Sequence, residues 1–147
     1  HEDGLRFVRS KTDCYDLIII DSPNPFGLGE GLFTKEFYGN CFGALREDGI
    51  MINQNESPFY TEEAFQCQRM HKRILETFPI CSISAHLPSY PSGHWLFGFA
   101  SKKYHPLTDL NGVAWKLKGI HTRYYEPRLH AGVFALPVYV EELLERC

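Results

Sequence analysis

The spacing of apolar and polar residues alternates along the first half of the chain between the period of a strand and that of a helix. A continuous aliphatic run within residues 15–21 predicts a strand apolar on both faces, as in the centre of a parallel sheet covered by helices. Residues 22–31 contain two prolines and three glycines and are therefore interpreted as a loop. Apolar residues three and four apart predict helices at 34–48 and 61–78, with a second strand at 50–55 between them.

The second half of the chain predicts a different strand connection. Two further strands are expected at 80–87 and 95–101, and their short linker excludes a helical crossover, so they should pair antiparallel. A polar, irregular stretch follows, and Pro137 begins a closing helix that ends near Glu145. The order strand–helix–strand–helix–strand–strand predicts an α/β fold with a hairpin at one sheet edge, in a single domain over residues 1–147.

Candidate chemistry follows from where the predicted parallel strands end. Ligands of such sheets bind beyond the carboxyl ends of the strands, and Asp21, Gln54 and Asn55 should share that rim. A carboxylate there suits a general base or a site for a cationic amine, although Asp21 could instead only accept hydrogen bonds from loop amides. The glycines of residues 27–31 do not follow a strand directly, as a nucleotide-binding fingerprint would. They are interpreted as letting the loop bend over a ligand.

Composition and charge exclude several classes of function. The 147 residues carry a formal charge of −3, which offers no broad attraction for nucleic acid or anionic membranes. No apolar run approaches the roughly 20 residues of a membrane span. Five scattered cysteines without a CxxC pair indicate reduced thiols and a cytoplasmic protein. Seven histidines lack metal-site spacing, so no metal is expected, and no GxSxG elbow supports hydrolase chemistry.

Five segments, in their order and spacing, resemble the spermidine synthase family. The segments are Asp3-Gly4, the run from Tyr15 to Gly27 with its Asp-Ser-x-Asn-Pro loop, Gln54, the Ser-Tyr-Pro-Ser-Gly turn at 89–93, and Tyr124-Tyr125 with His130-Ala131 and residues 134–137. The resemblance covers essentially the whole chain, but only about the last half of a family member. It implies a mixed sheet of the Rossmann-like methyltransferase type, preceded in the family by a small β-domain.

The resemblance also implies a reaction. The family transfers an aminopropyl group from decarboxylated S-adenosylmethionine to putrescine, which gives spermidine and methylthioadenosine. Because the sulfonium is already a good leaving group, no metal and no cofactor beyond this co-substrate is expected. An alkylammonium with a pKa near about 10 must lose a proton before it can attack, and a carboxylate in contact with it can accept that proton.

Site residues are carried over from the family by position. Asp21 matches the proton acceptor and is the expected catalytic residue. The residues expected to bind decarboxylated S-adenosylmethionine are Asp3, Gly4, Asp21 and Leu28. The residues expected to bind the polyamine are Asp21, Ser22, Asn24, Gln54 and Tyr90.

Two departures from the family pattern shape the expectations. Asn24 stands where the family commonly has a second Asp, so putrescine should bind more weakly, by about 1–2 kcal/mol, and another amine acceptor stays open. The family's glycine-rich nucleotide loop, the acid that holds the ribose and the amino-terminal domain would all precede His1. The chain alone is therefore expected to lack the first strands of its sheet and to be inactive. A non-catalytic module that self-associates through the exposed sheet edge is the alternative, and a homo-oligomer is expected.

Overall fold

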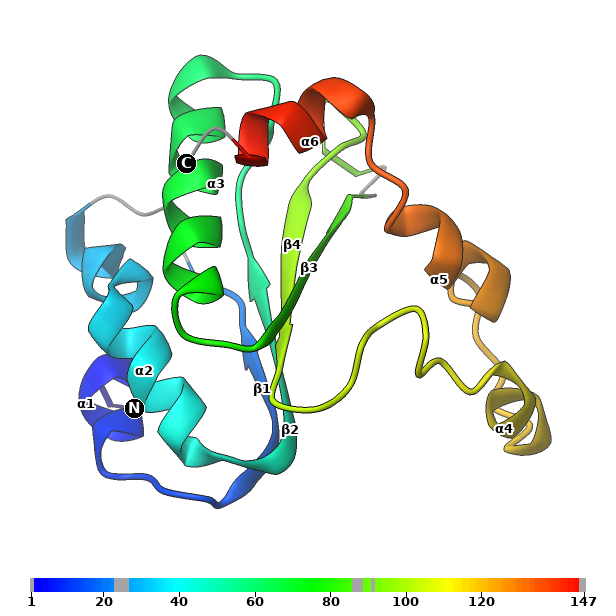
Figure 1. The fold of residues 1–147 in the computed structure, drawn as a ribbon, viewed down its shortest axis with the longest axis horizontal. Coiled ribbons are helices and arrows are strands. Elements are labelled where there is room, and N and C mark those ends of the chain that lie inside the picture. The colour runs from blue at the N-terminus through cyan, green and yellow to red at the C-terminus, as the bar shows by residue number, and fades with distance from the viewer. Residues whose placement is uncertain (1, 23–26, 86–88, 91, 146–147) are drawn as a thin grey trace.

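A computed structural model describes residues 2–22, 27–85, 89–90 and 92–145, which form a mixed sheet with helices packed against it (Figure 1). The strands are β1 (Tyr15–Ile20), β2 (Leu45–Gln54), β3 (Ile80–Ala85) and β4 (Leu96–Ser101). The helices are α1 (Gly4–Arg9), the 3₁₀ helix η1 (Gly27–Phe33), α2 (Lys35–Ala44), α3 (Thr61–Leu75), α4 (Gly112–Leu117), α5 (Pro127–Val133) and α6 (Val138–Glu145). Among these described helices, none is long and apolar enough to cross a membrane.

The four strands lie in the order β1-β2-β4-β3. β1 and β2 are parallel, whereas β4 runs antiparallel to both of its neighbours, β2 and β3. The predicted α/β class and the antiparallel hairpin at one sheet edge are therefore confirmed. This topology brings the carboxyl ends of β1 and β2 to the same rim as the start of β4, because antiparallel β4 enters the sheet where β2 leaves it.

The main core lies between the sheet and the helices α1, α2 and α3, which lie on the same side of it (Figure 1). The buried residues of this core are Val8, Ile20, Phe37, Tyr38, Cys41, Ala44, Leu45, Met51, Ile74, Phe78 and Ala100. A second buried cluster joins α3 and α6 to the hairpin and consists of Cys67, Ile83, Ala85, Leu96, Val140 and Leu144. Both clusters anchor the strands whose ends form the rim.

The opposite face of β1 is open, which corrects the prediction that helices cover this strand on both faces. Leu17 and Ile19 remain 52% and 68% exposed, whereas Ile20 on the helix-covered face is buried. On this side of the sheet α5 contacts β4, where the Phe134 ring centroid lies 6.4 Å from that of Phe99. The side chains of β1 alternate between the two faces of the sheet, and only those on the face packed against α1 and α2 are buried in the core.

The boundary between α2 and β2 lies earlier than the sequence predicts. α2 starts as expected, with Thr34 Oγ1 accepting from the Phe37 amide at 3.1 Å, but it ends at Ala44. β2 then begins at Leu45, with an irregularity in its pairing to β1 before Ile50. Gly49 lies in this irregular part, where an added Cβ would stand 2.8 Å from Leu45 Cβ. The glycine that sequence reasoning took as the helix stop instead permits this close approach.

Three helices were not predicted. Part of the stretch interpreted as a loop forms η1, and the polar stretch after β4 forms α4 and α5. α4 has no buried residue, and its cap is local, with Asn111 Oδ1 accepting from the Ala114 amide at 2.8 Å. A helix of six residues that buries no apolar stripe leaves little periodic signal in its sequence.

The close contact of Gly98 with β2 gives a stability prediction. A Cβ at Gly98, in β4, would stand 2.2 Å from Asn53 Oδ1, so Gly98→Ala should destabilise the chain by about 1–3 kcal/mol through overpacking. Gly43→Ala is the matched control, because a Cβ at this α2 position meets nothing within 4 Å. The control should be neutral or stabilising by up to about 1 kcal/mol in urea unfolding. Equal effects of the two substitutions would contradict the packing described for β4.

Candidate functional site

A cavity of about 470 Å³ lies beside β1 and brings several predicted site residues together. Its walls come from α1, β1, η1 and α2. The lining residues are Gly4, Phe7, Val8, Tyr15, Leu17, Ile18, Ile19, Ile20, Asp21, Ser22, Leu32, Phe37 and Cys41. The cavity thus brings Gly4 close to Asp21 and Ser22, although α1 lies between Gly4 and β1 in the sequence. The rest of the wall is mainly apolar, which suits a ligand with a flat or aliphatic body.

The end of β1 positions the polar part of this cavity. Ile20 anchors the strand in the core, and Asp21 follows it with an exposed carboxylate. The hydroxyl oxygen of Ser22 is buried and has no hydrogen-bond partner among the described residues. A buried hydroxyl without a partner is uncommon, and a bound ligand can satisfy it. Asp21 and Ser22 together can therefore accept hydrogen bonds from a cationic amine.

Asp3 and Gly4 also have structural roles. Asp3 is the N-cap of α1, and its Oδ1 accepts from the Arg6 amide at 2.8 Å. An added Cβ at Gly4 would lie 3.2 Å from Leu32 Cδ2, so glycine lets α1 approach η1 closely. The cap uses one carboxylate oxygen of Asp3.

Gln54 lies beside Asp21 on the rim. Ile20 pairs with Asn53 in the parallel register, and one further residue on each strand brings Asp21 next to Gln54. Beyond Gln54 the chain remains polar and buried, and Asn53 Nδ2 donates to Asn55 Oδ1 at 2.5 Å. The predicted placement of Asp21, Gln54 and Asn55 on one rim agrees with this register.

Glu56 is a buried acid on the same rim that sequence reasoning missed. Its side chain is 4% exposed, and neither its Oε2 nor that of Glu63 has a hydrogen-bond partner among the described residues. Burial first, and the neighbouring Glu63 carboxyl second, raise the pKa of Glu56 to about 7. The polar run directly after the second strand was the available signal, but its burial depends on how α3 packs.

The raised pKa of Glu56 makes stability depend on pH. An acid with a higher pKa when folded stabilises the chain fully below the unfolded value of 4.5, and this contribution is lost as pH rises through about 7. Glu56→Gln should therefore flatten the fall in melting temperature over this interval. Glu62→Gln, at an exposed position in the first turn of α3, should leave the fall unchanged. Identical pH profiles for wild type and Glu56→Gln would contradict the described burial of this carboxyl.

Tyr90 lies on the rim but does not line the β1 cavity. It precedes β4, where its ring centroid lies 4.3 Å from that of Trp95 at an interplanar angle of 30°. β2 lies between this hairpin and β1 in the sheet, and the predicted binding of one diamine by Tyr90 and Asp21 stays a prediction. Asn24 and the Leu28 side chain lie outside the described residues.

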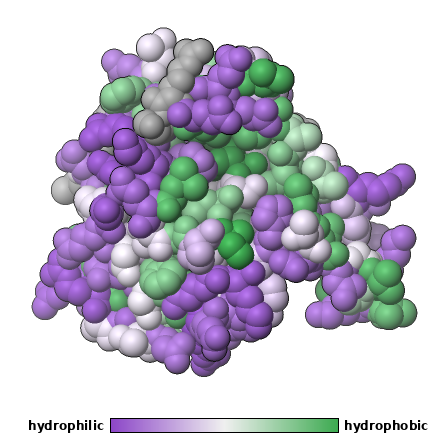
Figure 2. Space-filling model, viewed as in Figure 1, coloured by the Kyte–Doolittle hydropathy of each residue, from purple (hydrophilic) through white to green (hydrophobic). Residues whose placement is uncertain are grey.

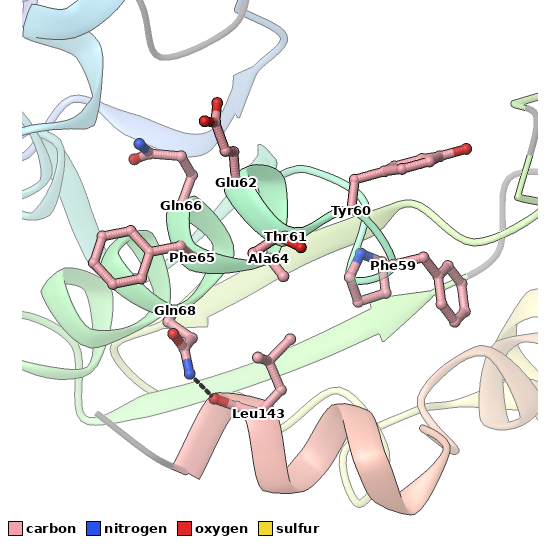
Figure 3. Close-up of a pocket in the computed structure, with 10 residues that line it drawn as sticks. Phe59, Tyr60, Thr61, Glu62, Ala64, Phe65, Gln66, Gln68 and Leu143 are labelled. Atoms are coloured by element: carbon pink, nitrogen blue, oxygen red, sulfur yellow. Dashed lines mark hydrogen bonds between the residues drawn. The ribbon is translucent and has the colours of Figure 1, made fainter.

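A larger hollow of about 750 Å³ lies at the start of α3 and contains none of the predicted site residues (Figure 3). Phe59, Tyr60 and Phe65 contribute much of its lining, and Leu143 of α6 closes one side. Gln68 donates to the Leu143 carbonyl and ties the two helices together (Figure 3). Of the described residues that line it, only Glu62 is acidic, so this hollow holds fewer groups that could act in catalysis than the rim at Asp21.

Comparison with known proteins assigns the chain to a family. Residues 1–111 match the sequence model of the spermine/spermidine synthase domain. The chain belongs to the spermine/spermidine synthase family. Its relatives include the polyamine aminopropyltransferases of Alkaliphilus oremlandii, 65% identical over 147 residues, and Clostridium beijerinckii, 61% identical over 145 residues. These alignments cover 99% and 98% of this chain but 52% and 51% of the relatives, so the chain spans about half their length.

Solved spermidine synthases share the fold. A spermidine synthase in complex with the transition-state analogue AdoDATO matches with a TM-score of 0.90 at 36% identity, over 98% of this chain and 49% of that one. The spermidine synthase of Thermotoga maritima matches with a TM-score of 0.88 at 35% identity, over 99% of this chain and 49% of that one. The mixed sheet described above is therefore the spermidine synthase fold over these residues.

Proposed function

We propose that this chain supplies the amine-activating part of a polyamine aminopropyltransferase site, with Asp21 as the proton acceptor. The observation that carries the proposal is the position of Asp21. Asp21 follows the carboxyl end of β1, in a largely apolar cavity with Gly4 and with the Ser22 hydroxyl, which has no hydrogen-bond partner among the described residues. Membership of the family supports aminopropyl transfer as the reaction.

The proposed reaction needs one proton transfer and one substitution at carbon. The ammonium of putrescine loses a proton to the Asp21 carboxylate, and the free amine attacks the carbon next to the sulfonium of decarboxylated S-adenosylmethionine. A C–N bond forms as the C–S bond breaks, and methylthioadenosine leaves with the electron pair on sulfur. The sulfonium charge is neutralised in this step, so no metal or further cofactor takes part in the proposal.

Each of the remaining predicted site residues is proposed to bind one of the two substrates. Gly4 lines the α1 side of the cavity and Asp3 directly precedes it, and both are proposed, with Leu28, to hold the nucleoside. Ser22, Asn24 and Gln54 are proposed to hold the diamine around Asp21. Ser22 can accept a hydrogen bond through its free hydroxyl, and Gln54 lies beside Asp21 by the register of β1 and β2.

Tyr90 is proposed to bind the far end of the diamine. Its stacking on Trp95 fixes the ring at the start of β4, and two strand spacings of about 4.8 Å separate β4 from β1. Because Asp21 follows β1 and Tyr90 precedes the antiparallel β4, the two residues adjoin the same edge of the sheet.

A chimera tests the proposed function. The chain would replace the matching half of the Alkaliphilus oremlandii relative, and spermidine formation from putrescine and decarboxylated S-adenosylmethionine would be followed by chromatography. We expect the chimera to form spermidine and the 147-residue chain alone to form little or none. A folded chimera that binds neither substrate would contradict the proposal. Self-association of the chain through the open face of β1, without nucleoside binding, would then favour a non-catalytic module.

A further inference from the structure

A polar pocket of about 560 Å³ lies between η1, the start of α2 and the middle of α3. It is lined by Glu30, Gly31, Phe33, Thr34, Gln66, Arg69 and Arg73. None of these residues lines the β1 cavity, and neither the proposed reaction nor the core uses the pocket. On the face shown in Figure 2, hydrophilic side chains dominate the side where α1 and α2 lie.

Two arginines supply the charge of this pocket. Arg69 and Arg73 are four residues apart on α3 and therefore project from the same face of the helix. Arg73 donates to the Phe33 carbonyl, while the Arg69 guanidinium lies 5.9 Å from the centroid of the Phe65 ring. Among the described residues, neither arginine forms an ion pair with a carboxylate. By contrast, nearby Lys35 forms an ion pair with Glu76, in which Lys35 Nζ lies 2.8 Å from Glu76 Oε2.

The other lining groups leave room for an anion. Thr34 is occupied, because its hydroxyl donates to the Gly31 carbonyl at 2.9 Å and accepts from the Phe37 amide. Gln66 projects from α3 on the side away from Leu143, whereas Gln68 points toward that residue (Figure 3). Among the described residues that line the pocket, Glu30 supplies one carboxylate, against two guanidinium groups. The pocket thus combines a positive balance with several N–H donors.

We propose that this pocket binds a small oxyanion, a phosphate or a carboxylate, through Arg69, Arg73 and the Gln66 amide. Guanidinium groups present paired N–H donors that match the oxygens of both anions. A bound anion bridges η1 to α3, since Arg73 already contacts the carboxyl end of η1. This inference concerns binding alone and does not depend on the proposed aminopropyl transfer.

Titration of the chain with inorganic phosphate tests the proposal, with acetate as the carboxylate probe, each followed by calorimetry. We expect saturable binding of at least one probe, and the preferred probe identifies the class of anion. Arg69→Gln should weaken it about tenfold, or about 1.4 kcal/mol. Arg123→Gln, at an exposed arginine outside the pocket, should leave it unchanged.

Two further variants change the charge of the pocket in opposite directions, and their folding is checked separately. Gln66→Glu should abolish binding by adding a negative charge, and Glu30→Gln should strengthen it by removing one. Thermal melting of each variant shows whether it is folded. Absence of saturable binding by either probe, or equal affinities in wild type and a folded Arg69→Gln, would overturn the proposal.

Discussion

Asp21→Asn should lower kcat for spermidine formation by about 10²–10⁴-fold in the chimeric enzyme, the range expected for loss of a general base. An amide keeps the size of the side chain and its hydrogen bonding but cannot accept the proton of the ammonium. Because Asp21 is exposed at the end of β1 and lies outside the core, the variant should fold as the wild type does. Initial rates at saturating concentrations of both substrates measure the effect.

Asp16→Asn is the matched control for that experiment. Asp16 belongs to the same strand and is exposed, but it lies at the opposite end and pairs with Arg46 at 2.7 Å. Loss of an exposed ion pair costs at most about 1 kcal/mol of stability and should leave kcat unchanged. If kcat fell less than tenfold for Asp21→Asn, or fell equally for both variants, Asp21 would not be the proton acceptor.

Leu96→Ala should have the largest effect on stability, a loss of about 2–5 kcal/mol in the free energy of unfolding. Leu96 is fully buried at the start of β4, in the cluster that joins the hairpin to α3 and α6. Its removal leaves a cavity among side chains from all of these elements. The backbone of Leu96 also joins β4 to the segment after β2, since the Leu96 carbonyl accepts a hydrogen bond from the Asn55 amide at 2.8 Å.

Urea unfolding measures this effect against Leu117→Ala. Leu117 is 84% exposed at the end of α4, so its truncation should change stability by no more than about 0.5 kcal/mol. A Leu96→Ala variant as stable as this control would mean that the second cluster does not hold the hairpin to the helices.

Local patterns account for the parts of the fold that the sequence predicted. The aliphatic run of β1, the start of α3 at Thr61 and the short linker of the hairpin each depend on neighbouring residues. The end of α2 depends instead on a distant contact. β2 begins before Gly49 because β1 pairs with it there. Similarly, the exposure of Leu17 and Ile19 depends on which face of the sheet the helices cover, which the sequence of a single strand does not encode.

In the candidate site, too, the sequence predicted what depends on local patterns and missed what depends on distant packing. Asp21 and Gln54 were predicted to share a rim because both end parallel strands, and the register of these strands agrees. Glu56 escaped prediction because an acid after a strand is ordinarily solvated. Its burial arises from the packing of α3, which brings Glu63 near it. The grouping of Tyr90 with Asp21 rests on the family resemblance and stays a prediction, because Tyr90 is not among the residues that line the cavity beside β1.

The central claim is that the cavity beside Asp21 binds the nucleoside of an aminopropyl donor. Calorimetric titration of the chain and of the chimera with methylthioadenosine tests it most directly. We predict saturable binding that weakens on Asp21→Asn and on Asp3→Asn, the latter keeping a side chain that can cap α1. Asp16→Asn should bind as wild type does. Absence of binding by both folded proteins, or binding that none of these substitutions changes, would contradict the assignment of this cavity.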